Sequence, residues 1–209
     1  MVGLDEVVWN EPPDREEAGS PNVVGAVALH AAIDAIGEVG WPALLAHDRR
    51  TSLMLHEGLR KTPGVTVLGP VPGTDSLPVA AFLIEGVPHA LVAARLSAEF
   101  AIAVRHGCFC AHPYLTRLLG LSAQEIERFR DGVRHGDRRS MPGAVRASCG
   151  INSTEADIDA LLVAVADIAR GTPAPVDYVQ DPRSGDFFPD PATGWCVDVR
   201  VQRGPCSPG

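Results

Sequence analysis

The feature that most constrains the fold is a change in hydrophobic period close to Gly64. Before it, residues 21–39 and 42–62 carry apolar side chains at helical spacing, with no strand pattern between them. After it, short strand-like runs alternate with further helical stretches. Because the two periods mix without strict βαβ spacing, the sequence predicts a small α/β or α+β sandwich, one sheet covered by helices.

The two N-terminal helices have recognisable ends. We expect the first to begin with Ser20 as its cap and Pro21 at its first position, and to stop at Gly40. Its surface is apolar nearly all round, which predicts a buried helix. The second should end at Pro63-Gly64. Neither helix has a strand of its own to cover, so both are expected to need another apolar surface.

The remaining elements follow from local patterns. Strands are predicted over residues 65–68, 77–84, 101–104 and 144–148, and helices over residues 88–97, 122–134 and 154–170. The last two helices open with capping boxes, Ser122 with Glu125 and Thr154 with Asp157. Residues 172–209 are rich in proline and glycine and are predicted to form an extended tail with one or two strands.

Charge and composition narrow the class of protein. The net charge is −8 and the acids are scattered, which argues against a nucleic-acid surface or a polybasic membrane patch. No apolar run has the length of a membrane span, and the first residues are acidic rather than a basic leader, so we expect a cytoplasmic protein. The five cysteines are odd in number and unevenly spaced, which favours free thiols over a disulfide framework.

Residues 105–113, RHGCFCAHP, hold the densest chemistry in the chain. Cys108 and Cys110 lie within a few residues of one arginine and two histidines, and cationic neighbours lower the pKa of a thiol. Gly107 permits unusual backbone angles. The segment is therefore typical of a reactive-cysteine loop. The alternative is that both thiols pack beneath the sheet and the histidines are solvated.

The same segment also allows a metal site. Cys108, Cys110 and His112 alternate, so in an extended backbone their side chains would point to one face. Zinc sites usually space their first ligand pair by two to four residues and need a fourth ligand, which here would have to be Cys149. The spacing therefore makes this the weaker reading.

Two further positions could bind anions. Arg146 lies within the predicted strand 144–148, and its guanidinium fork matches a carboxylate. The alternative for Arg146 is a surface arginine at a strand end. Residues 17–20 offer a hydroxyl and backbone amides at a helix start, which suits a phosphate group but is more often only a helix cap.

Taken in order, four segments resemble the class V aminotransferase family, the pyridoxal-phosphate (PLP) enzymes that include the cysteine desulfurases. They are residues 16–29 (EEAGSPNVVGAVAL), 38–70, 102–115 (IAVRHGCFCAHPYL) and 144–162 (AVRASCGINSTEADIDALL). The first is similar to the family's E-A-G-T/S-P-N segment and the third to its R-x-G-x-x-C-A-x-P loop. The fourth is similar to the segment R-x-S-x-x-x-N-T-x-E-D-I-D that closes the domain.

This resemblance implies the C-terminal half of a fold-type I PLP-dependent transferase, with the large domain mostly absent. Residues 1–40 would be the remnant of the large domain and the interdomain helix. Residues 41–171 would be the small C-terminal domain, and residues 172–209 a tail. The expected partners are an amino-acid substrate and either a separate N-terminal half or a second copy of the chain.

Carried over position by position, the resemblance implies roles for four residues. Cys110 would be the cysteine that takes sulfur from the substrate in desulfurases, and Arg146 would bind the substrate α-carboxylate. Arg105 would lie near the substrate, and Ser20 would touch the cofactor phosphate across a dimer interface. The chain departs from the pattern at Cys108, where many desulfurases carry histidine. The variant Gly-Cys-Phe-Cys is similar to molybdenum-cofactor sulfurases, so the substrate stays open.

The lysine that holds PLP in this family has no counterpart. Lys61 is the single lysine, it lies in the second helix, and the residue directly before it is Arg60 rather than histidine. The family's aspartate and stacking histidine for the cofactor ring are also missing, so we expect the chain to begin after the lysine-bearing part. The sequence therefore suggests part of an amino-acid transferase, inactive alone. A non-catalytic relic or interaction domain and a Cys/His metal-binding module are the alternatives.

Overall fold

The computed structural model describes residues 5–17, 19–69, 76–193, 195–196 and 204–205. The chain divides into two units, residues 1–45 and residues 46–209. The domain boundaries at residues 40 and 171 inferred from the sequence remain predictions.

The first unit contains a short 3-10 helix, Asp14–Glu16, and the helix α1, Val23–Val39. The prediction that Ser20 caps α1 is wrong, because the Asn22 side chain accepts the backbone N–H of Gly25 at 2.9 Å. The predicted stop at Gly40 is confirmed, since Gly40 has φ of +90°. The prediction of a buried helix is wrong for this chain alone, because no residue of α1 is buried.

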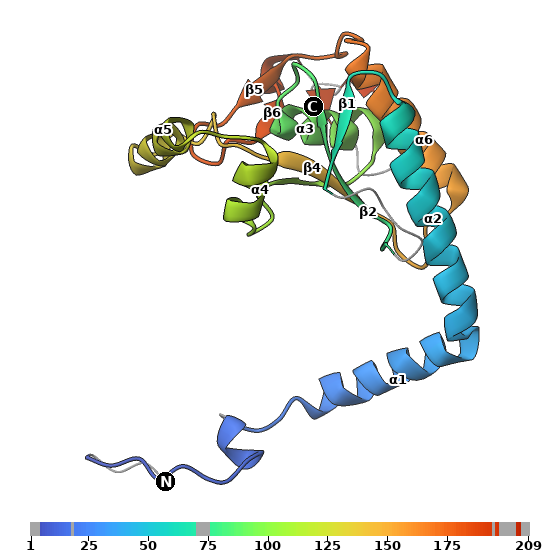
Figure 1. Cartoon of the computed structure of the whole chain (residues 1–209), viewed down its shortest axis with the longest axis vertical. Helices are drawn as coiled ribbons and strands as arrows, with labels where there is room; N and C mark the ends of the chain where they lie inside the picture. The colour runs from blue at the N-terminus through green and yellow to red at the C-terminus, as the bar shows by residue number, and fades with distance from the viewer. Residues whose placement is uncertain (1–4, 18, 70–75, 194, 197–203, 206–209) are drawn as a thin grey trace. The chain divides into compact units, whose positions relative to one another are not determined.

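The second unit is built on a four-stranded antiparallel sheet in the order β1-β2-β4-β3 (Figure 1). Its strands are β1 (Val65–Leu68), β2 (Val79–Ile84), β3 (Arg105–Gly107) and β4 (Ala144–Ser148). Each neighbouring pair is antiparallel. The expected mixed α and β architecture is therefore confirmed, with this sheet at its centre and two smaller strand pairs in the tail.

Five α-helices accompany this sheet in the described residues. They are α2 (Trp41–Lys61), α3 (His89–Phe100), α4 (His112–Leu118), α5 (Ala123–Arg134) and α6 (Glu155–Ala169). Both predicted capping boxes are confirmed, at Ser122 with Glu125 and at Thr154 with Asp157. Helix α4 was not predicted, and it starts directly after the cysteine loop.

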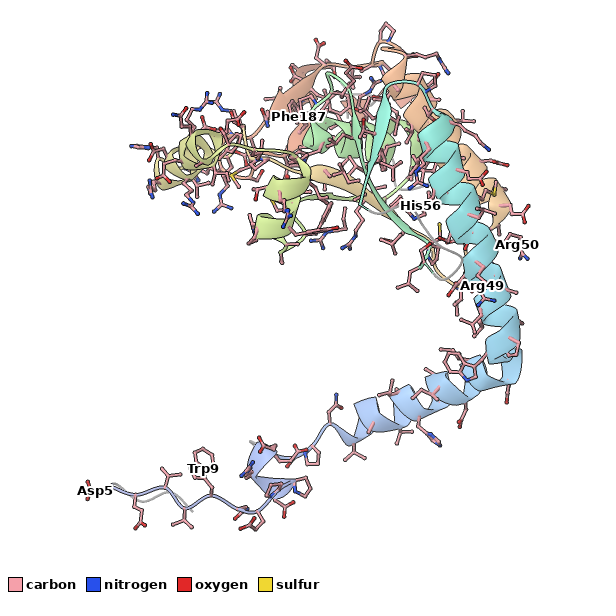
Figure 2. The ribbon with its side chains drawn as sticks, in the orientation of Figure 1. Asp5, Trp9, Arg49, Arg50, His56 and Phe187 are labelled. Carbon is pink, nitrogen blue, oxygen red and sulfur yellow. The ribbon has the colours of Figure 1, made fainter. Side chains whose placement is uncertain are left out.

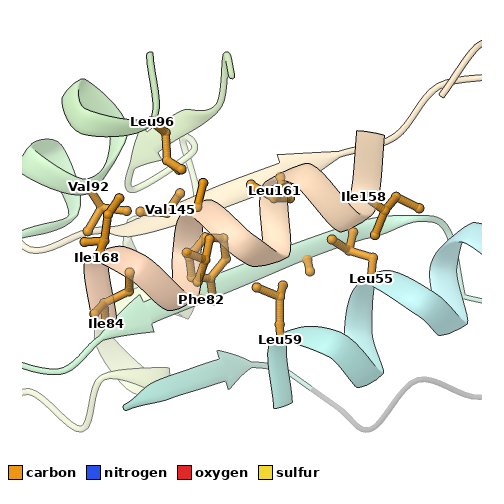
Figure 3. Packing of buried hydrophobic residues seen from close by; sticks show 14 residues of the cluster. Leu55, Leu59, Phe82, Ile84, Val92, Leu96, Val145, Ile158, Leu161 and Ile168 are labelled. Carbon is orange, nitrogen blue, oxygen red and sulfur yellow. The ribbon is translucent and has the colours of Figure 1, made fainter. Parts of the chain in front are cut away.

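The main core lies between one face of the sheet and the helices α2, α3 and α6 (Figure 3). Successive residues of a strand point to opposite faces, so alternate positions of β2 and β4 enter this core. The largest fully buried side chains are those of Phe82, Leu55, Leu59, Leu96 and Ile158. Figure 2 marks His56 on the same helix as Leu55 and Leu59, and it is also buried.

The opposite face of the sheet carries a smaller apolar cluster. Cys108, Leu115 and Ala144 are its buried members, and Leu68, Leu83 and Phe109 pack against them. Because Ala144 belongs to this cluster and Val145 belongs to the main core, Arg146 points to the same face as Ala144. Because side chains alternate between the two faces along β4, Arg146 lies on the face opposite the helix-covered core.

The predicted strand over residues 101–104 is wrong. Ala101 is the left-handed cap of α3, with φ of +56°, and the strand comes directly afterwards at Arg105–Gly107. Ile102 and Val104 nevertheless pack against the main core. Their apolar character therefore reflects burial of a connecting segment rather than pairing in the sheet.

The C-terminal tail forms one hairpin and a second short pair of antiparallel strands. Strand β5 (Tyr178–Gln180) pairs with β6 (Phe187–Pro189), and β7 (Trp195–Cys196) pairs with β8 (Gly204–Pro205). The predicted strands in the tail are thus confirmed. Figure 1 shows the first hairpin beside α3, and Phe187 is marked there in Figure 2.

Within the described residues, no individual helix is both long enough and apolar enough to cross a bilayer. The consecutive helices α1 and α2 reach that length and composition only when they are counted as one bent pair.

Candidate active site

The Cys110 loop has a strained turn at its centre. Phe109 and Cys110 both have left-handed backbone angles, with φ of +54° and +57°, although neither is glycine. Such conformations cost about 1–3 kcal/mol each and gather at functional sites. The turn is closed by a hydrogen bond from the Ala111 N–H to the Cys108 carbonyl at 2.9 Å. It leaves Cys110 exposed, immediately before α4.

The two cysteines of the loop have different environments. Cys108 is buried, and its thiol donates to the carbonyl of Pro142 at 2.9 Å. Burial raises the pKa of the Cys108 thiol, which keeps it protonated and unreactive. Cys110 is the exposed thiol of the pair. The alternative that both thiols pack beneath the sheet is therefore wrong for Cys110, because only Cys108 of this pair is buried.

Two arginines lie side by side on the same face of the sheet. Arg105 of β3 is directly opposite Arg146 of β4 in the strand register. Directly opposite residues have Cβ atoms about 5 Å apart, and like charges there destabilise the sheet. Among the described residues, neither guanidinium has an ion-pair partner, and the buried Nε of Arg146 has no hydrogen-bond partner. This arrangement suits an anion such as a carboxylate.

Phe109 connects the cysteine loop to this arginine pair. The guanidinium carbon of Arg146 lies 5.1 Å from the centre of the Phe109 ring, a cation–π distance. The strained turn thus places the ring against Arg146 and the thiol of the next residue in solvent. Sequence reasoning missed Phe109, and the only signal was its position between two cysteines.

A cavity of about 740 Å³ adjoins the loop. Its lining includes Arg105, Cys110 and His112, and also His89, His106 and Asp186. The structure therefore brings Arg105 and Cys110 to one cavity, with Arg146 on the neighbouring strand. Ser20 belongs to the first unit, where it is exposed.

The metal hypothesis relied on an extended backbone from Cys108 to His112, and that expectation is wrong. The left-handed turn breaks the alternation, and His112 begins α4. Cys149 packs against the main core, whereas Cys108 belongs to the cluster on the opposite face of the sheet. In the part of the chain that the structure describes, no three His, Cys, Asp or Glu residues are grouped as metal ligands.

The residues of this chain do not by themselves fit PLP. Lys61, the single lysine, is exposed on α2, and its Nζ lies 2.8 Å from the Glu57 carboxylate. It lines none of the cavities beside the cysteine loop. Its amine is therefore a surface charge and is not placed to hold a cofactor near Cys110.

The fold and site together define a partial domain of fold-type I PLP-dependent enzymes. The family model for class V aminotransferases matches residues 1–161. The chain therefore belongs to the class V aminotransferase family, whose members are PLP-dependent.

Relatives and solved structures agree with this family. The chain is 30% identical over 174 residues to a probable cysteine desulfurase of Halobacterium salinarum, covering 83% of this chain and 36% of the relative. It is 36% identical over 142 residues to a probable cysteine desulfurase of Xylella fastidiosa, covering 61% and 33%. The structure of a cysteine desulfurase from Thermococcus onnurineus is similar with a TM-score of 0.63 and 28% identity, covering 82% of this chain and 37% of that one.

The cysteine desulfurase CsdA of Escherichia coli is similar with a TM-score of 0.59 and 27% identity. It too is matched over only 37% of its length, against 83% of this chain. The chain thus spans about a third of the length of the relatives that it matches. The expected resemblance and the partial fold are both confirmed.

Proposed function

We propose that this chain is the sulfur-accepting part of a PLP-dependent, cysteine desulfurase-like enzyme that acts on an amino acid. In this proposal the cofactor lysine belongs to another polypeptide segment, in a separate half or a partner subunit. When bound, PLP supplies an electron sink for chemistry at the substrate α-carbon. The chain supplies the thiol and the carboxylate-binding face.

The observation that carries the proposal is the grouping around the strained turn. Cys110 is exposed beside a cavity that Arg105 also lines, and Arg146 lies directly opposite Arg105. A thiolate is the nucleophilic form of cysteine, and two unpaired guanidinium groups favour bound anions nearby. Cys110 would accept the substrate sulfur, and Arg146 would hold the α-carboxylate with Arg105 close to it.

Ser20 is proposed for the phosphate end of the cofactor. It is exposed two residues before Asn22, whose side chain caps α1. Helix N-termini favour anions, which supports a phosphate contact in this region. The cofactor whose phosphate Ser20 contacts would be held by the lysine-bearing segment or by a second copy of the chain.

A mixing experiment tests the proposal. The chain would be combined with a lysine-bearing PLP domain of the same family, and sulfur release from cysteine would be measured. We expect release only from the mixture, and loss of release with Cys110→Ser but not with Cys149→Ser. Formation of a PLP-loaded complex that releases no sulfur and transfers no amino group would contradict the proposal.

A non-catalytic interaction domain is the second candidate function, and the exposure of α1 favours it. Six large apolar side chains of this helix are more than half exposed: Val23, Val24, Val27, Leu29, Ile33 and Val39. Such a patch marks a surface that another protein covers. An interaction domain would bind the lysine-bearing segment equally well with Cys110→Ser and would never carry sulfur.

A further inference from the structure

The cavity beside Cys110 has room for more than the groups that the proposed function assigns to it. Its volume is about 740 Å³, within the range of about 300–1,000 Å³ that is typical of small-molecule pockets. Of its described lining residues, the proposed function gives a role to Arg105 and Cys110. The other lining residues therefore bear on which further ligand the cavity accepts.

The C-terminal tail supplies part of this lining. The family match ends at residue 161, whereas the β5–β6 hairpin spans residues 178–189. The segment 138–143, which leads into β4, lines the cavity as well. Four residues at the turn of the hairpin line it: Gln180, Ser184, Gly185 and Asp186. A part of the chain beyond the family match thus shapes the cavity beside Cys110.

The hairpin is held on α3 by a buried ion pair. Arg95 and Glu99 are both buried, and the Arg95 guanidinium donates to the Glu99 carboxylate at 2.8 and 2.9 Å. Arg95 also donates to the carbonyl of Thr172, and the Tyr178 hydroxyl donates to Glu99. Removing one partner of a buried pair leaves an uncompensated charge, so these contacts give the tail a defined position on the second unit.

The turn of the hairpin fixes the backbone of Arg138. The N–H of Arg138 donates to the carbonyl of Pro182 at 2.8 Å. Gly185 packs against the other side of the same peptide, because a Cβ at Gly185 would lie 2.6 Å from the Arg138 carbonyl oxygen. Gly185 also has φ of +83°, which favours glycine. The hairpin therefore seats Arg138 at the edge of the cavity.

Two carboxylates in this neighbourhood are committed to other groups. The Arg139 side chain donates to both oxygens of Asp137, and these hydrogen bonds lower the pKa of Asp137 to about 2. Asp186 Oδ1 lies 3.2 Å from His106 Nε2. Among the described residues, the Arg138 guanidinium has no ion-pair partner. Its charge is therefore available to a ligand.

The cavity thus offers two unpaired guanidinium groups. Arg105 and Arg138 both line it, and Arg146 lies directly opposite Arg105 in the sheet. Asp186 carries the only carboxylate among the described lining residues. The guanidinium fork matches carboxylate and phosphate groups. With the α-carboxylate of the amino acid at Arg146 and Arg105, Arg138 is left to bind a second anionic group.

We propose that Arg138 binds the sulfur acceptor, and that this acceptor is a small molecule with a carboxylate or phosphate group. The inference rests on the proposed function, in which Cys110 takes sulfur from the amino acid. The volume of the cavity suits a small acceptor, and the unpaired Arg138 supplies the charge that recognises it. The tail hairpin contributes indirectly, because it fixes the backbone of Arg138.

The transfer needs no further reagent. Cys110 carries the substrate sulfur as a persulfide, and a nucleophile on the acceptor attacks the outer sulfur atom. The bond between the two sulfur atoms breaks, and its electron pair stays on Cys110 Sγ as the thiolate. The outer sulfur and its hydrogen leave with the acceptor. Arg138 holds the anionic group of the acceptor during this step, so it is a substrate-binding residue for the second half of the reaction.

Two alkylating reagents of nearly equal size test the proposal, because iodoacetate is an anion and iodoacetamide is neutral. The ratio of their rates at Cys110 is measured by peptide mass spectrometry at low salt, for the unmodified chain, Arg138→Gln and Arg183→Gln. Arg183 lies on the same turn and is exposed, but it does not line this cavity. A change in the thiolate population affects both reagents equally, so the ratio reports the charge that the reagent meets.

We expect Arg138→Gln to lower the ratio of iodoacetate to iodoacetamide rates about twofold, the effect of one charge roughly 10 Å away in water. Arg138→Lys keeps the charge and should keep the ratio, and Arg183→Gln should match the unmodified chain. Inorganic phosphate at constant ionic strength should slow iodoacetate more than iodoacetamide, and this difference should disappear in Arg138→Gln.

Equal ratios in Arg138→Gln and Arg183→Gln would overturn the proposal. A ratio in the unmodified chain no higher than that of cysteine in solution would also overturn it, as would equal slowing of both reagents by phosphate. None of these measurements needs PLP. Failure of the proposed function would be seen separately, because Cys110 would then gain no sulfur from the amino acid, whatever the ratio of alkylation rates.

Discussion

The Arg146 guanidinium lies over the Phe109 ring, with 5.1 Å between its central carbon and the ring centre. The contact joins a strand residue to a loop residue whose backbone is left-handed. The loop thus fixes two things together: the thiol of Cys110 and the direction of the arginine. A substitution at Phe109 should therefore affect the orientation of Arg146 as well as the loop.

If Arg146 holds the substrate carboxylate as proposed, replacing Phe109 by alanine should weaken that binding. A cation–π contact contributes about 0.5–1 kcal/mol at an accessible site, so KM in the assembled enzyme should rise about twofold to fivefold. Steady-state kinetics would check this. Phe109→Tyr keeps the ring and should behave like the unmodified chain. An unchanged KM for Phe109→Ala would show that the ring does not orient Arg146.

Replacing Arg105 by glutamine should stabilise the isolated chain. Arg105 and Arg146 are directly opposite without a described anion between them, so removing one charge should gain about 0.5 kcal/mol. This substitution leaves the contact between Arg146 and Phe109 in place. Urea unfolding at low salt would measure the gain, and added sulfate should stabilise the unmodified chain more than the variant. If Arg105→Gln loses stability at low salt, the two charges are not in conflict.

The two loop thiols should react at different rates. Cys110 is exposed, whereas Cys108 is buried with a raised pKa, so iodoacetamide should label Cys110 first under native conditions. Peptide mass spectrometry would identify the site. Cys108→Ala leaves the Pro142 carbonyl without its donor and should cost about 1–2 kcal/mol, whereas Cys108→Ser keeps a donor and should cost less. Faster labelling of Cys108 would contradict the structure.

The stability of the chain should fall as the solution becomes acidic. Burial and the nearby Arg60 charge hold the pKa of His56 below its ordinary value. The unfolded state, with a histidine pKa of about 6.5, then binds more protons, so this contribution is present above that pH and is lost below it. Denaturant unfolding at several pH values should show a shallower acid loss for His56→Gln. If the free energy of unfolding falls with acid equally steeply in His56→Gln and in the unmodified chain, His56 does not cause the loss of stability.

Local patterns in the sequence correctly predicted the contacts between residues that are close together in the chain. The capping boxes at Ser122 and Thr154 are contacts over three residues, and both form. The strand predicted over residues 101–104 is wrong because the apolar side chains of Ile102 and Val104 pack against the core without pairing in the sheet. The residues that do pair, Arg105 and His106, are polar. Apolarity alone does not distinguish these two cases.

Contacts between distant residues were not predictable in the same way. His106 and Asp186 are eighty positions apart, and nothing local to either one indicates the other. The left-handed turn at Phe109 was also hidden, because that conformation is expected for glycine rather than phenylalanine. The roles of Cys110, Arg146, Arg105 and Ser20 came from the resemblance and stay predictions.

The central claim is that Cys110 accepts sulfur when a lysine-bearing segment completes the site. The most direct measurement is mass spectrometry of the thiols after the chain is mixed with such a segment, PLP and cysteine, followed by alkylation without reductant. We predict one additional sulfur atom on Cys110, absent when either the segment or PLP is omitted. Additional sulfur on Cys108 instead, or on no cysteine of a complex that binds PLP, would contradict the claim.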